Sequence, residues 1–438
     1  MPTSTSEAVR VAVLADSDTR WKWGALTARR IAPSTSVELS GFLLRGRATP
    51  TARQLAEVGV RADALREVTG NEFLRTMKDE PYDIVVLALV GGAVQAMLHG
   101  LAALALPRRP VVVTGYVGVV YEKLSDGLLL RHGADVVLAN SRHDADRFRA
   151  VYEGVGADAS AVTEAALPFL GGEPYAPKDD RDTLVFAAQP SVPASRADRT
   201  YLLRRLVEHA RLHPKREVLL KLRSKPGEHT THIEELPYQK LADKLPGGLP
   251  PNFRLVYGHM GDVLDRTDLL VTVSSTAALE SLHRRIPTAV LTDFGVREAL
   301  GNHHFLGSGL MASWDQLDGG HRPTPDAEWL AGQGVAADGS YDSAFDEVRK
   351  RVAELLLVPS LPAPAPYYTP STAPGYLPGI LARHHLAPDG TPLPGSAVTT
   401  EVSGVRRVVR EAVREVARGA YRHGVQRVAP VIRRMGEL

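Results

Sequence analysis

Short apolar runs of strand length recur along the first 170 residues, and polar segments with helical spacing of their apolar positions separate them. The predicted strands are 9–15, 37–44, 82–89, 110–114, 134–139 and 162–167. The predicted helices are 24–31, 51–58, 71–78, 93–104 and 143–152. Runs that are apolar at nearly every position are typical of strands covered on both faces. This alternation predicts an α/β domain with a parallel sheet and helices on both sides.

The same alternation resumes after residues 171–182, a polar segment rich in Gly and Pro that reads as an interdomain linker. Further strands are predicted at 183–188, 216–222, 254–257, 268–273 and 287–291, and helices at 197–212, 277–284 and 341–357. We therefore predict two Rossmann-like domains, 1–170 and 183–358.

Two further segments follow the predicted domains. Residues 359–398 are dense in proline, which fixes φ and removes backbone donors, so they are expected to form an extended strap or a tether. Residues 399–438 are expected to form a basic amphipathic helix, with Val405, Val409 and Val413 on one face and Arg406 and Arg410 beside them. Such a helix suits an anionic membrane surface, and packing against this or a second protein chain is the alternative.

Composition narrows the class of protein. Apolar residues make up 44% of the chain and charged residues 23%, and the net charge of +2 gives no bulk attraction to nucleic acid. The chain has no cysteine, which excludes disulfides, thiol nucleophiles and cysteine metal sites. The apolar stretch 84–106 has the length of a membrane span, but Gly91 and Gly92 divide it, so a strand, a turn and a buried helix are predicted.

Three hydroxyl residues stand where a predicted strand feeds a predicted helix. Ser274, Ser275 and Thr276 follow the strand 268–273 directly. Such a turn offers backbone N–H groups, hydroxyl donors and the positive end of a helix dipole, which together suit a phosphate. The alternative is an ordinary helix N-cap.

The pattern around this turn resembles a known group of enzymes. A strand ending in Ser-Ser-Thr, a helix carrying Glu280, a basic turn and a Pro-led strand resemble the C-terminal domain of bacterial surface-polysaccharide glycosyltransferases. These are the capsule Kdo-transferases, the sialyl- and polysialyltransferases and the related glycerophosphotransferases. The chain also resembles an uncharacterised glycosyltransferase family of GC-rich bacteria. The resemblance covers about 183–294 and implies the GT-B arrangement, with two Rossmann-like domains facing across a cleft.

The resemblance also assigns roles in the second domain. It implies that Ser274, Ser275 and Thr276 hold the phosphate of a nucleotide-sugar donor, and that Gln189 and Ser191 contact the donor. Lys225-Pro226 stands where these relatives carry His-Pro, so Arg223 and Lys225 are expected to neutralise the leaving phosphate. His259 and Glu280 are further nucleotide-binding candidates. His229 and His232 have helical spacing but lack an acidic or Cys partner, and we expect no metal site there.

The first domain carries the candidate bases. Asp16 and Asp18 follow the first strand, at the edge where open α/β sheets bind ligands, and either carboxylate can take a proton from an acceptor hydroxyl. Trp21 and Trp23 are expected to stack on an acceptor sugar, or alternatively to pack in the core. Asp126, in Ser125-Asp126-Gly127, matches the acidic motif of sialyltransferases without its first acid, and a helix-start turn is the alternative.

These observations predict a cytoplasmic glycosyltransferase that works without metal or cofactor and inverts the donor sugar. The basic tail adds the inner face of the membrane as a second candidate location. By resemblance the donor is a CMP-linked ulosonic acid, and the acceptor is a glycan or a lipid-linked glycan. The alternatives are a polyol-phosphate transferase using CDP-glycerol, a nucleotide-sugar 2-epimerase, and a non-catalytic glycan-binding scaffold. Nucleic acid is not expected as a partner.

Overall fold

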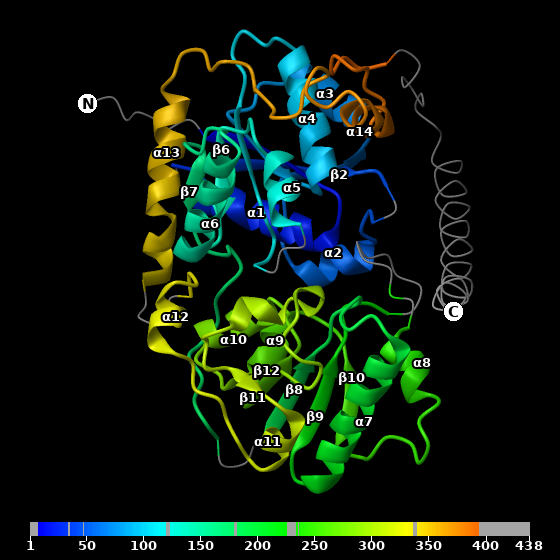
Figure 1. The fold of residues 1–438 in the computed structure, drawn as a ribbon. Helices are drawn as coiled ribbons and strands as arrows, with labels where there is room; N and C mark the ends of the chain where they lie inside the picture. Colours follow the sequence, from blue (N-terminus) through cyan, green and yellow to red (C-terminus); the bar gives the residue numbers. More distant parts are fainter. Residues whose placement is uncertain are drawn as a thin grey trace. The chain divides into compact units, whose positions relative to one another are not determined.

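The computed structural model describes residues 8–33, 36–46, 48–119, 123–178, 182–225, 234, 236–335 and 340–393. These residues form two compact units (Figure 1). Unit 1 contains the described residues up to Gly171 and from Asp326 onward, and unit 2 contains those from Gly172 to Pro325. Pro226, His229, His232 and the predicted tail helix 399–438 lie outside the described residues.

Unit 1 is built on a seven-stranded sheet of order β3-β2-β1-β4-β5-β6-β7, in which every neighbouring pair is parallel. Its strands are β1 Val9–Ala15, β2 Val37–Leu44, β3 Ala64–Val68, β4 Ile84–Ala88, β5 Val111–Gly115, β6 Val136–Ala139 and β7 Val162–Glu164. Its helices are α1 Asp18–Ile31, α2 Ala52–Val58, α3 Gly70–Asp79, α4 Gly91–Ala103, α5 Leu124–Leu129, α6 Arg142–Gly154, α12 Ala327–Ala331, η3 Ser340–Phe345, α13 Asp346–Leu356 and α14 Leu377–Arg383.

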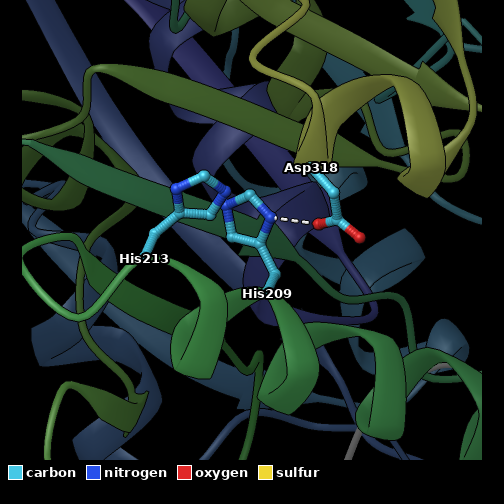
Figure 2. A group of neighbouring side chains, drawn as sticks. All are labelled: His209, His213 and Asp318. Atoms are coloured by element: carbon cyan, nitrogen blue, oxygen red, sulfur yellow. Dashed lines mark hydrogen bonds and ion pairs between the residues drawn. The ribbon is translucent and has the colours of Figure 1, made fainter.

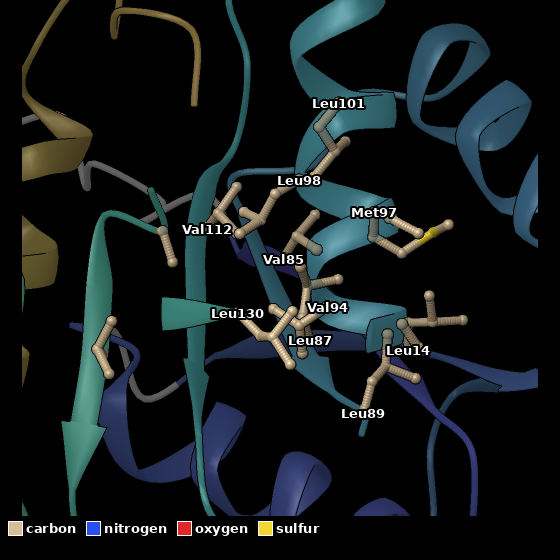
Figure 3. Close-up of a cluster of buried hydrophobic side chains, with 14 of the residues drawn as sticks. Leu14, Val85, Leu87, Leu89, Val94, Met97, Leu98, Leu101, Val112 and Leu130 are labelled. Carbon is tan, nitrogen blue, oxygen red and sulfur yellow. The ribbon is translucent and has the colours of Figure 1, made fainter. Parts of the chain in front are cut away.

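Helices cover both faces of this sheet, so the central strand β4 is buried along its whole length. Val85 and Leu87 pack beneath α4, against Val94, Met97 and Leu98 (Figure 3). The alternate residues of β4 belong to the opposite cluster, which contains side chains of α1 and α13. Burial of each such side chain contributes about 1.5–3 kcal/mol. The stretch 84–106 is therefore a strand and a core helix, as predicted, and none of the helices among the described residues is long and apolar enough to cross a bilayer.

Unit 2 repeats the plan with a six-stranded parallel sheet of order β10-β9-β8-β11-β12-β13. Its strands are β8 Thr183–Ala187, β9 Glu217–Lys221, β10 Phe253–Val256, β11 Leu269–Thr272, β12 Thr288–Leu291 and β13 Met311–Ala312. Its helices are α7 Arg196–Leu212, α8 Tyr238–Ala242, α9 Met260–Leu264, α10 Ala277–His283, η1 Glu298–Leu300, η2 Asn302–Phe305 and α11 Trp314–Asp318. Phe186 and Leu220 pack toward α7, while Val185 and Leu219 face the cluster with residues of α9 and α10.

The C-terminal limit of the second domain differs from the prediction of 183–358. Helix α13 lies on the sheet of unit 1, where Val348 and Val352 are fully buried in one cluster with Val11 and Val113. Residues 359–393 of the predicted strap also belong to unit 1. The amphipathic pattern of α13 was readable from the sequence, but a single sequence does not say which of two similar sheets such a helix covers.

The packing of α13 generates a stability prediction. Phe345, at the start of α13, is 1% exposed and packs in the core cluster of unit 1. Phe345→Ala should lower the free energy of unfolding of this unit by about 3–5 kcal/mol, because it removes a buried ring and leaves a cavity. Urea unfolding followed by circular dichroism measures the loss. The control is Leu357→Ala, at a position that is 83% exposed, which should leave the midpoint unchanged. Equal midpoints for the two variants would contradict the assignment of α13 to this core.

Candidate functional site

Parallel pairing brings the carboxyl ends of all strands in unit 2 to one edge of its sheet. In spatial order this edge carries Tyr257 and His259 after β10, Arg223 and Lys225 after β9, Gln189 and Ser191 after β8, Ser274, Ser275 and Thr276 after β11, and Asp293 after β12. Candidates that are far apart in sequence therefore follow neighbouring strands. Ligands of open α/β sheets bind at this edge.

Gln189 and Ser274 join the ends of the two central strands of unit 2. The Ser274 N–H donates to Gln189 Oε1 at 3.0 Å, and Gln189 Nε2 donates to Ser274 Oγ at 3.1 Å. The Ser274 hydroxyl donates to the Leu300 carbonyl at 2.5 Å, and the residue is only 2% exposed. The structure therefore corrects the expected role of Ser274: its hydroxyl is committed to a buried network that holds the turn, and it is not presented to a ligand.

Ser275 and Thr276 occupy the partly exposed side of the same turn. The Ser275 N–H donates to Thr272 Oγ1 at 3.1 Å, and Ser275 Oγ accepts the Ala277 N–H at 3.2 Å. The N-cap residue of α10 is Thr276, and Ser275 accepts the N–H of the first helical residue, Ala277. A hydroxyl that accepts a bond still carries its own donor hydrogen. Thr276 makes no side-chain cap bond to α10. These two hydroxyls are the part of the triplet that a ligand at the edge can use.

Two cationic side chains follow the neighbouring strand β9. Arg223 is partly buried and Lys225 is exposed, with Lys225 Nζ 5.9 Å from the centre of the Tyr257 ring. Gln239 connects the loops after β9 and β10, because its Nε2 donates to the Ser224 carbonyl at 3.2 Å and to the Tyr257 hydroxyl at 2.9 Å. Positive charge thus lies beside the loop after β10, following a strand that pairs with β8.

The remaining nucleotide-binding candidates also lie on this edge or one turn into its helices. His259 precedes α9 and pairs with Asp262 at 3.5 Å. Glu280 is partly exposed on α10, and Ser191 is partly exposed in the loop between β8 and α7.

The sequence analysis missed the residue that shapes the β8–α7 loop. Arg199 is 1% exposed in α7 and donates to the carbonyls of Gln189, Pro190 and Pro193. It also forms a buried ion pair with Glu234. The two terminal nitrogens of this buried guanidinium are paired, and their bonds fix the loop beside Gln189. One arginine among several on an amphipathic helix gives no sequence signal of this role.

The carboxyl edge of unit 1 carries the candidate bases. Asp16 Oδ1 accepts from Arg20 at 2.9 Å, and Asp16 Oδ2 accepts the Val90 N–H at 3.0 Å. Asp16 therefore ties the loop after β1 to the loop after β4. Asp18 is the first residue of α1 and is partly exposed.

Trp21 and Trp23 require a correction. Helix α1 begins at Asp18, earlier than predicted, because Ser17 accepts the Arg20 N–H and caps it. Both indoles consequently lie on the buried face of the helix, at 0% and 1% exposure, in the core of unit 1. The alternative of core packing holds, and neither ring presents a face to a sugar.

Asp126 lies in the first turn of α5 and is partly exposed. Its Oδ1 accepts from the Tyr368 hydroxyl at 3.3 Å, a contact with the C-terminal strap that the sequence did not indicate. Tyr121 and Glu122, which precede α5, lie outside the described residues.

Comparison with known proteins assigns the chain to a family. Residues 11–355 match the family described as "Putative glycosyltransferase (DUF6716)". The chain belongs to this family. As a member it is an enzyme of the glycosyltransferase class, and its two parallel-sheet Rossmann-like domains are those of the GT-B fold. No curated protein matches the chain.

Solved structures share the fold of this glycosyltransferase at low sequence identity. UDP-GlcNAc 2-epimerase from Neisseria meningitidis, bound to UDP-GlcNAc, is 11% identical with a TM-score of 0.50, over 80% of this chain and 100% of that one. The Methanocaldococcus jannaschii enzyme, in complex with UDP-GlcNAc and UDP, is 10% identical with a TM-score of 0.50, over 78% and 99%. At these identities the likeness concerns the fold alone.

Within the described residues of this glycosyltransferase, one group of side chains has the composition of a metal site: His209, His213 and Asp318 (Figure 2). His209 Nδ1 lies 2.6 Å from Asp318 Oδ1, and His209 Nε2 lies 2.9 Å from Arg216. Because a guanidinium only donates hydrogen bonds, His209 Nε2 accepts from Arg216. The ring hydrogen is therefore on Nδ1, which donates its N–H to Asp318 Oδ1. Both ring nitrogens are occupied and Arg216 brings a positive charge, so the group is a structural network.

This network generates a pH prediction. Burial lowers the pKa of His209, against the opposing effect of its bond to Asp318, so the folded state favours the neutral ring. In the unfolded chain, this histidine takes up a proton near pH 6.5. The stability that His209 contributes is therefore fully present above pH 6.5 and is lost as the pH falls below it. The loss is at most about 1.4 kcal/mol per pH unit. The urea midpoint should therefore fall between pH 7.5 and 5.5.

The variant His209→Asn should show a smaller fall of the midpoint over the same pH range, because its side chain does not titrate. His321→Asn, at an exposed position, is the matched control and should keep the wild-type dependence. A pH dependence in His209→Asn equal to that of the wild type would show that His209 does not contribute.

Proposed function

We propose that the protein transfers a sugar from a nucleotide-activated donor to a hydroxyl group of a cell-surface glycan or a lipid-linked glycan. The observation that supports this best is the order of groups along the carboxyl edge of unit 2: two cations after β9, and the Ser275 and Thr276 hydroxyls after β11, on either side of the Gln189 loop. Cations and hydroxyl donors at such an edge are the groups that bind phosphate.

Each group has a separate role in the proposal. Ser275 and Thr276 donate to the donor phosphate, while Arg223 and Lys225 offset the negative charge that develops as the nucleotide leaves. Groups fixed before the reaction begins stabilise this charge without reorganising. Gln189 and Ser274 hold the turn in position. Because the cations are supplied by side chains, the proposal requires no metal ion.

Ser191, His259 and Glu280 are the proposed contacts to the nucleoside. A carboxylate such as Glu280 accepts ribose hydroxyls, and His259 lies on the loop after β10. The donor implied by resemblance is a CMP-linked ulosonic acid, whereas two solved structures with this fold hold UDP-GlcNAc. Binding measurements with both kinds of nucleotide distinguish these donors.

Asp18 is the proposed base on the side of unit 1. Its carboxylate is partly exposed at the edge of the sheet and accepts from the Thr19 hydroxyl at 3.3 Å. Asp16 accepts from Arg20 and from the Val90 N–H, and Asp126 accepts from Tyr368. Removal of the acceptor proton by Asp18 lets the acceptor oxygen attack the face of the sugar opposite the nucleotide, which inverts the anomeric centre.

The phosphate assignment predicts a difference between the two ends of β9. Lys225→Gln should weaken nucleotide binding about tenfold or more, because a charge-assisted bond to phosphate is lost. Lys215→Gln removes an exposed lysine at the amino end of the same strand and should leave binding unchanged. Calorimetry with CMP, CDP and UDP measures both. Absence of binding by all three would favour the scaffold alternative, and equal effects of the two variants would refute the assigned site.

The base assignment predicts a loss of rate without a loss of binding. Asp18→Asn should lower kcat about 10²- to 10⁴-fold, since the acceptor proton is no longer removed, and should leave the nucleotide Kd unchanged. Acceptor-dependent release of CMP or UDP measures the rate, with Asp79→Asn, an exposed carboxylate at the end of α3, as the control. A C2 epimer formed without acceptor, seen by NMR, would identify an epimerase, and a phosphodiester product would identify a polyol-phosphate transferase.

A further inference from the structure

The Pro-rich segment, predicted as a strap or tether, is packed onto unit 1. Leu377, Ile380 and Leu381 of α14 are buried in the cluster beneath α4. The Tyr368 carbonyl accepts from His99 Nε2 at 3.0 Å and from Gln95 Nε2 at 3.4 Å. Residues 359–393 are thus a fixed part of the domain, and we call them the strap.

The strap places a group of tyrosines beside Asp126. The rings of Tyr367 and Tyr368 are 5.3 Å apart at 82°, and those of Tyr368 and Tyr376 are 5.4 Å apart at 73°. The Tyr368 hydroxyl donates to Asp126 Oδ1 at 3.3 Å. Tyr376, at the outer end of this series, is 43% exposed. Tyr376 is thus linked to Asp126 through Tyr368, and burial and, next, the Asp126 carboxylate raise the pKa of Tyr376.

This group lies at the functional edge of unit 1. Helix α5, which carries Asp126, follows β5 in the chain, and the loops after parallel strands meet at the carboxyl edge of the sheet. The strap also contacts α3, because Asn71 Nδ2 donates to the His385 carbonyl at 3.2 Å. Its backbone is close to Gly70, at the start of α3.

We propose that Tyr376 and Asp126 form the acceptor subsite, in which the apolar face of a neutral pyranoside stacks on the Tyr376 ring and its hydroxyls donate to Asp126. This inference rests on the proposed function, since it names the substrate class that unit 1 binds. An aromatic ring beside a carboxylate offers a pyranose both an apolar surface and a charged acceptor. The same carboxylate repels an anionic sugar, which fixes the preference for a neutral one. The tyrosines of the strap take the role that sequence analysis gave to Trp21 and Trp23.

The full-length protein is tested by saturation-transfer NMR with the methyl glycosides of glucose, galactose, mannose and N-acetylglucosamine, and with methyl glucuronide as the anionic contrast. At least one neutral glycoside should bind more tightly than the glucuronide. Tyr376→Ala should weaken that binding about tenfold, and Asp126→Asn should weaken it and reduce the discrimination against the glucuronide. Tyr376→Phe keeps the ring and should keep the affinity. Leu393→Ala, an exposed strap position, is the control and should bind as the wild type does.

Failure of this inference is distinguishable from failure of the proposed function. Absence of binding by all four neutral glycosides, or equal binding by the wild type and Tyr376→Ala, overturns the subsite even where calorimetry shows a bound nucleotide. Binding that depends on Tyr376 in a protein that binds no nucleotide supports the subsite and removes the donor half of the proposed function.

Discussion

Parallel strand pairing, buried on both faces, is the constraint on which the rest of this molecule depends. A parallel strand must be followed by a crossover that returns the chain to the opposite end of the sheet, and here helices supply most of these crossovers. The inner strands β4, β5, β8 and β11 are therefore buried at every position, and the candidate polar groups lie in the loops that follow the strands. Asp16 after β1, Gln189 after β8 and Ser275 after β11 hold equivalent positions in this scheme. Topology thus fixes where a ligand binds, and only loop composition decides which ligand it is.

Most of this scheme was readable from the sequence because its signals are local. The uniform apolar run of β4 and the polar segment that forms α6 each depend on a few adjacent residues, and both elements lie close to their predicted positions. Helix α4 begins at Gly91, two residues before the predicted start, so the glycine pair belongs to its first turn. Strand β3 was missed because four of its five residues are exposed and its sequence, ALREV, carries no apolar run. It lies at the edge of the sheet, where pairing with β2 alone defines it as a strand.

The side-chain roles within each loop were less predictable, because they depend on partners distant in sequence. Ser274 and Ser275 are chemically identical neighbours, yet Ser274 is turned inward by Gln189, 85 residues earlier, and by the Leu300 carbonyl. The hydroxyl-rich turn was recognisable, but which hydroxyl holds the turn and which faces outward was not. Similarly, with Ser17 as its cap, α1 begins at Asp18 and not at the predicted residue 24, which places Trp21 within the helix and in the core.

The strap shows how a Pro-rich segment that contains one short helix, α14, can be held in place by residues distant in sequence. Proline lacks an N–H and restricts φ, so a Pro-rich segment loses less entropy on ordering and offers carbonyl acceptors with few donors. Unit 1 supplies the complementary groups: Arg109 donates to the Pro362 carbonyl, His99 to that of Tyr368 and Asn71 to that of His385. These bonds provide hydrogen-bond donors for three backbone carbonyl groups of the strap. Tyr368 is held through its backbone carbonyl, which leaves its side chain available to contact Asp126, 242 residues away in sequence.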